Sequence, residues 1–154
     1  MNINQLARIA VGSFAFSLTA ILVAIISVPF IEGPLEEIYR ANEDIWRNGV
    51  IGDGFNDSST FVYWLLHKLV FGICMAILYE WSCPSLSTQG WRRGFFVGLI
   101  SVPMIAAIYL GLWSVMTLPT ALWLWWAGFY FFSGTISGAV MGLCMEKTPR
   151  FSAK

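Results

Sequence analysis

The stretch FVYWLLHKLVFGICMAILYEW, from Phe61 to Trp81, decides the fold class of this chain. It is almost wholly apolar, and about 20 residues at a helical rise of 1.5 Å each span a hydrocarbon core of roughly 30 Å. Two polar residues, His67 and Lys68, lie well inside it, and His67 is the only histidine of the chain. The stretch therefore predicts a transmembrane helix that carries a polar pair.

The rest of the chain repeats this apolar pattern. Of 154 residues, 57% are hydrophobic and only 12% are charged, whereas about 25% charged residues are usual in soluble domains. We expect an all-α membrane protein, a single integral membrane domain over residues 1–154, built as a four-transmembrane-helix bundle. The expected spans are about 9–31, 61–80, 94–118 and 121–145. Only Leu118-Pro119-Thr120 joins the last two spans, so we expect a tight antiparallel hairpin there and two helical hairpins in all.

The basic residues predict the orientation of the chain. One side of the expected membrane carries six Lys and Arg residues, namely Arg8, Arg92, Arg93, Lys147, Arg150 and Lys154. The other side carries two, Arg40 and Arg47. Cytoplasmic loops carry the excess of Lys and Arg. We therefore expect a multi-pass protein of a bacterial inner membrane with its N- and C-termini in the cytoplasm.

The first outer loop, residues 32–60, is expected to contain a short amphipathic helix. Seven of the nine acidic residues lie between Glu32 and Asp57. Within GPLEEIYRANEDIWRNG, Pro34 suits a first helical turn and Gly49 suits a C-cap. Because the helix is acidic, it is a poor ligand for anionic lipid and is expected to pack on the bundle or on a partner.

Glycines recur at helical spacing in the last two spans. Gly134, Gly138 and Gly142 are four residues apart, as are Gly94 and Gly98. Small residues let helices approach closely in lipid. These five glycines predict a helix-packing face of the glycine-zipper kind, either inside the bundle or against another protein.

The polar pair has two separate interpretations. Lys68 has a long apolar stem and is expected to act as an interface anchor, lifting its ammonium to the outer surface. His67 has a short side chain and must find its partner locally. In the structural interpretation, His67 makes a hydrogen bond inside the bundle. The functional one is a cofactor site, because a single His suffices as the axial ligand of a chlorophyll-type pigment.

No motif of an enzyme is present. The chain lacks H-E-x-x-H, G-x-S-x-G and the glycine-rich nucleotide loops, and its three cysteines have no metal-binding spacing. We therefore expect no catalytic residues and no metal site. No basic block indicates nucleic acid.

The leading hypothesis is a non-catalytic integral membrane subunit or scaffold of a larger membrane protein complex, with membrane lipids and other integral membrane proteins, or further copies of itself, as partners. The alternatives are a small oligomeric channel or transporter, or a pigment- or quinone-binding subunit that uses His67.

Overall fold

The computed structural model describes residues 3–41, 58–83 and 86–148 of the chain, and this described part is helical and contains no strand. The four helices are α1 (Ile3–Arg40), α2 (Ser58–Ser82), α3 (Gly90–Trp113) and α4 (Thr120–Lys147). The predicted all-α architecture with four long helices is confirmed. The helix bounds extend the expected spans, except that α3 ends earlier.

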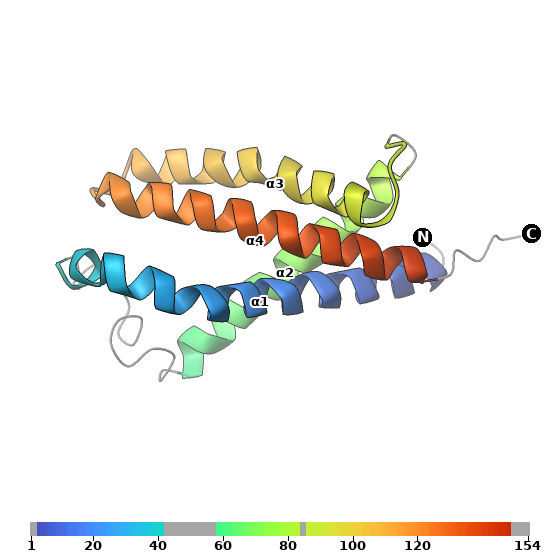
Figure 1. Ribbon diagram of the computed structural model, residues 1–154, viewed down its shortest axis with the longest axis horizontal. Helices are drawn as coiled ribbons and strands as arrows, with labels where there is room; N and C mark the ends of the chain where they lie inside the picture. The colour runs from blue at the N-terminus through green and yellow to red at the C-terminus, as the bar shows by residue number, and fades with distance from the viewer. Residues whose placement is uncertain (1–2, 42–57, 84–85, 149–154) are drawn as a thin grey trace, which may run out of the picture.

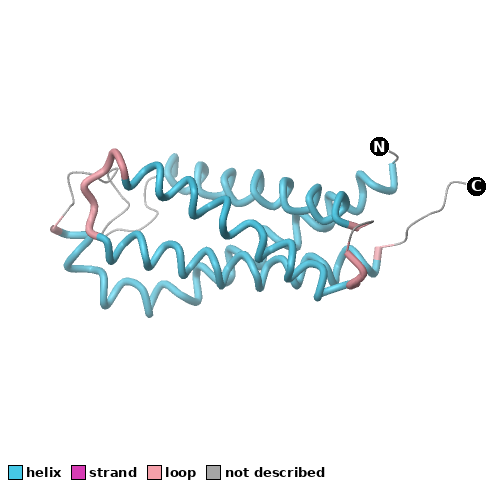
Figure 2. Tube along the Cα trace, turned by 90° about the horizontal axis from the view of Figure 1, so that it is seen from above, coloured by secondary structure: helices cyan, strands magenta, loops and turns pink. Residues whose placement is uncertain are grey.

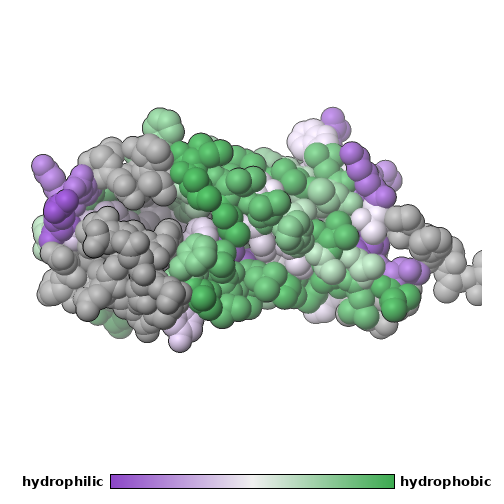
Figure 3. All heavy atoms as spheres, turned by 90° about the horizontal axis from the view of Figure 1, so that it is seen from below, coloured by the Kyte–Doolittle hydropathy of each residue, from purple (hydrophilic) through white to green (hydrophobic). Residues whose placement is uncertain are grey.

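Each helix contains a segment long and apolar enough to cross a membrane. The four segments are Ile3–Ser27, Phe61–Ser82, Gly90–Trp113 and Thr120–Lys147. The surface in Figure 3 shows the corresponding apolar band, with hydrophilic residues gathered toward the two ends of the molecule. The band follows from the composition of the helices, because the few charged residues lie mostly beyond or near the helix ends.

The connection between α3 and α4 is longer than the three residues predicted. It comprises residues 114–119, because α3 ends at Trp113. The Ser114 hydroxyl donates to the Gly111 carbonyl at 2.6 Å, and the Met116 amide donates to the Leu112 carbonyl at 2.9 Å. These bonds satisfy carbonyls that a helix end leaves without partners. Pro119 also disfavours helical backbone at the residue before it.

The helices are arranged so that α1, α3 and α4 run side by side while α2 crosses them obliquely (Figure 1, Figure 2). Helix α3 packs along α4, α4 packs along α1, and α1 packs against α2, whereas α2 and α3 meet much less. The beginning of α1 and the end of α4 lie at the same end of the molecule as the end of α2 and the beginning of α3 (Figure 1). We call this end the terminal half and the opposite end the distal half.

The terminal half is closed by backbone contact between α3 and α4. A Cβ atom on Gly94 would overlap the Gly138 carbonyl oxygen, and one on Gly98 would overlap the Gly134 carbonyl oxygen. A Cβ atom on Gly142 would likewise overlap the Gly90 carbonyl oxygen. All five glycines singled out from the sequence therefore lie between two helices of the same chain, where they admit closer approach than any side chain would allow.

Arg8 ties three helices together at the terminal end. Its side chain is only 3% exposed and pairs with the Glu80 carboxylate of α2 at 2.8 Å. One guanidinium nitrogen also donates to the carbonyls of Met145, at 2.6 Å, and Thr148, at 2.7 Å, at the end of α4. Arg8 thus satisfies carbonyls at a helix C-terminus and a carboxylate at once, through charge-assisted hydrogen bonds.

The distal half is joined by aromatic and aliphatic side chains instead. Helix α1 continues to Arg40, so the first part of the expected amphipathic helix forms its last turns, and residues 42–49 lie outside the described residues. The Trp126 indole donates to the Tyr39 hydroxyl at 2.9 Å. Burial raises the pKa of Tyr39, and the bond from Trp126 opposes this rise. The buried residues of this contact are Leu35, Leu118, Leu122 and Trp123.

Candidate functional site at His67 and Lys68

The structure places the polar pair of α2 the opposite way round from the expectation. Lys68 is buried, with 5% of its surface exposed, and its backbone carbonyl accepts a hydrogen bond from the Ser17 hydroxyl of α1 at 3.0 Å. His67 is exposed on the outside of the helix bundle. The prediction that Lys68 lifts its ammonium to water as an interface anchor does not fit this placement, and neither does a bond of His67 inside the bundle.

The reason for this reversal is the position of α2 in the bundle. The expectation of an interface anchor assumes that all four helices begin at one level, which would put Lys68, seven residues after Phe61, near a membrane surface. Figure 1 shows that α2 begins well short of the distal ends of α1 and α4. Lys68 lies beside Ser17, ten residues before the end of the apolar segment at Ser27, or roughly 15 Å along α1. That distance exceeds the length of a lysine side chain.

Three aromatic rings surround the ammonium group of Lys68. Its Nζ atom lies 5.3 Å from the ring centroid of Tyr130, 5.6 Å from that of Trp64 and 5.8 Å from that of Phe129. At such distances the negative faces of the rings attract a cation. Both ion pairs found among the described residues involve other cations, Arg8 and Arg40. Within that part of the chain, the ammonium of Lys68 faces aromatic rings and is paired with no carboxylate.

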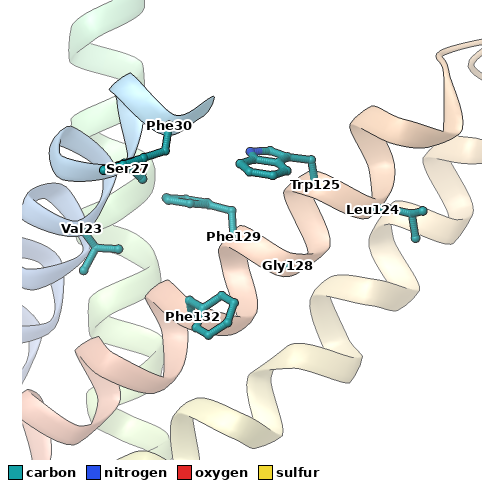
Figure 4. A pocket seen from close by; sticks show the side chains of 8 residues that line it. All are labelled: Val23, Ser27, Phe30, Leu124, Trp125, Gly128, Phe129 and Phe132. Carbon is teal, nitrogen blue, oxygen red and sulfur yellow. The ribbon is translucent and has the colours of Figure 1, made fainter. Parts of the chain in front are cut away.

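An apolar cleft lies beside this aromatic box, between α1 and α4 in the distal half. Its volume is about 320 Å³, and its lining residues are Val23, Ser27, Phe30, Leu124, Trp125, Gly128, Phe129 and Phe132. Figure 4 shows the ring of Phe129 reaching from α4 toward α1. Phe129 belongs both to the cleft and to the box around Lys68. One ring therefore connects the buried charge with the cleft.

His67 belongs to an outward stripe of α2. Its ring stacks on Phe71, with the centroids 6.3 Å apart and the planes at 15°. Among the described residues, no hydrogen bond or ion pair involves its ring nitrogens. The exposed residues of the stripe are Tyr63, Leu66, His67, Val70, Ile73 and Cys74. An imidazole thus lies among apolar side chains on the face that α2 turns away from the bundle.

Sequence reasoning did not find the aromatic box or the cleft. Trp64 precedes Lys68 by four residues, and this helical spacing was a signal that the two side chains meet. Phe129 and Tyr130 come from another helix, and no local pattern links them to Lys68. In the described part of the chain, no group of three or more His, Cys, Asp or Glu side chains is placed to hold a metal ion.

Together these features define an all-helical, multi-pass membrane protein by the length and composition of its helices. Comparisons with known protein families, with curated proteins and with solved structures found no match to this chain.

Proposed function

We propose that this chain is a non-catalytic integral subunit or scaffold of a larger membrane protein complex, and that it joins its partner through the outward stripe of α2. The observation that carries the proposal is the exposed imidazole of His67. Polar side chains in transmembrane helices almost always face a bundle interior or a water-filled cavity. An outward His67 therefore favours a second polypeptide that supplies a hydrogen-bond partner at this depth.

The glycines lend this proposal no support. They were a reason to expect an external packing face, but Gly94 and Gly138 face each other within the chain. The exposed apolar residues of α2 and α3 are equally neutral evidence, because lipid covers such residues in any membrane protein. The proposal therefore depends on His67 and on the stripe around it.

The test is site-specific photo-crosslinking in native membranes. A benzophenone side chain at Val70, in the stripe, should give one adduct with another membrane protein. The same group at Ile108, an exposed position of α3, should give lipid adducts only. His67→Leu should reduce the Val70 adduct by about tenfold, since a lost buried hydrogen bond to a polar partner is worth roughly 1–2 kcal/mol.

Three results would overturn the proposal. Lipid adducts alone at Val70 would mean that the stripe faces lipid. An adduct of twice the chain's own mass would favour the small homo-oligomer of a channel or transporter. Visible absorbance of the purified protein that His67→Leu abolishes would assign the imidazole to the metal of a chlorophyll-type pigment, the second candidate that an exposed ring nitrogen favours.

We also propose that the terminal half faces the cytoplasm of a bacterium and that the protein lies in the inner membrane. The exposed basic residues Arg92 and Lys147 belong to this end, while Arg40 at the distal end is paired with Glu36. Reporter fusions after Gly49 and at Lys154 should give opposite sidedness, with Lys154 in the cytoplasm. The same compartment for both fusions would contradict this topology.

A further inference from the structure

The ammonium group of Lys68 differs from the other buried cations. Arg8 and Arg93 are also buried, and both donate to acceptors, Arg8 to Glu80 and Arg93 to the Leu86 carbonyl at 3.0 Å. Lys68 donates to no acceptor among the described residues. The surrounding rings attract its charge, but they offer no strong acceptor to its three N–H donors. An ammonium in this state is costly in hydrocarbon, and an anionic oxygen would satisfy it.

The adjoining cleft indicates what carries that oxygen. Its side chains are apolar except for Ser27, whose hydroxyl already donates to the Ala24 carbonyl at 2.8 Å. At about 320 Å³, it lies at the small end of ligand pockets, which range over roughly 300–1,000 Å³. A single hydrocarbon chain suits such a volume, and the cleft shares the ring of Phe129 with the aromatic box around Lys68.

We infer that Lys68 and the cleft form one binding site for an anionic headgroup carried on an apolar chain, with the headgroup held by Lys68 and the chain held between α1 and α4. The carboxylate of a free fatty acid and the phosphate of an anionic phospholipid share this chemistry. The site does not depend on the stripe of His67, which lies on a different face of α2, so it stands or falls independently of the proposed complex.

The experiment uses the full chain in nanodiscs of phosphatidylcholine. Dibromostearate, a carboxylate probe, and its uncharged methyl ester quench indole fluorescence. Because the chain has eight tryptophans, binding in the cleft is measured as the part of the quenching that Trp125→Phe removes. Lys68→Met should weaken dibromostearate binding at least about tenfold, as expected for the loss of a charge-assisted bond. The affinity of Lys68→Met for the methyl ester should equal that of the wild type, and this result would also show that the variant is folded. Lys68→Arg should still bind dibromostearate. Arg40→Met is the matched control for the loss of one positive charge.

A second pair of variants tests the cleft. Gly128 lines it, while Gly111 of α3 does not, and a Cβ atom on either would meet nothing within 4 Å. Gly128→Leu should weaken both probes, whereas Gly111→Leu should weaken neither. Displacement of the probe by palmitate would identify a fatty acid, and displacement by phosphatidylglycerol would identify a phospholipid. Equal affinity of wild type and Lys68→Met for dibromostearate, or no displacement by either competitor, would overturn the inference.

Discussion

The terminal and distal halves of this bundle are held together by different means. In the terminal half, α3 and α4 touch backbone to backbone at Gly94 and Gly138, and Arg8 joins three helices at the end. In the distal half, rings such as those of Trp123 and Phe129 separate the helices and leave a cleft, and Phe129 also lies against the buried cation Lys68.

This difference fits a division between stability, which rests on the terminal half, and the binding that we propose for the distal half. Lipid is as apolar as the helices, so association depends on close packing and on buried polar bonds. Helices that touch at glycine leave no room for a ligand. Helices spaced by aromatic rings leave gaps that an apolar chain can enter. We therefore expect substitutions in the terminal half to change stability most and those around Lys68 to change binding.

The largest effect is expected from Arg8→Met. Removing one partner of a buried ion pair leaves the other uncompensated, which costs about 3–5 kcal/mol. The free energy of unfolding, measured by titration with dodecyl sulfate in bicelles, should fall accordingly. Arg40→Met is the matched control, because its pair with Glu36 is exposed at 65% and 53% and such pairs contribute roughly 0.5 kcal/mol. Equal losses for the two variants would contradict the assigned role of Arg8.

A smaller loss is expected from Gly94→Ala. The added methyl group would strike the Gly138 backbone, and overpacking of this kind costs about 1–3 kcal/mol. Gly111→Ala, in the same helix but with open space around it, should be neutral or stabilising by up to roughly 1 kcal/mol. The same unfolding titration compares them. If the two alanine variants had equal stability, the glycine contact would not be what closes the terminal half.

The smallest effect is expected from Trp126→Phe in the distal half. It removes the bond to the Tyr39 hydroxyl, which is worth about 1 kcal/mol. Amide hydrogen exchange in residues 35–40 should therefore accelerate by about fivefold, while residues 8–17 of the same helix keep their protection. Trp125→Phe, which alters a neighbouring ring in the cleft, should leave residues 35–40 unchanged. Uniform acceleration along α1 would mean that the two halves open together.

The polar pair shows where sequence reasoning reached its limit. The helix that carries it was predictable from apolar length, and so was the spacing of the glycines on α3 and α4. Which side chain of the pair enters the bundle was not predictable, because it depends on the rotation and starting level of α2. Successive residues of a helix are rotated by about 100°, so turning α2 by that angle about its axis would exchange the environments of His67 and Lys68.

The sequence alone determined that four helices are long and apolar enough to cross a membrane, because the apolar length of a segment decides whether it enters hydrocarbon and each helix satisfies its own backbone. It also determined where helices can touch, because glycine is the smallest residue. Only the tertiary structure decided that the glycines meet within one chain and that Lys68 lies among the rings of two helices beside a cleft. Those outcomes depend on crossing geometry, which arises from packing between distant segments.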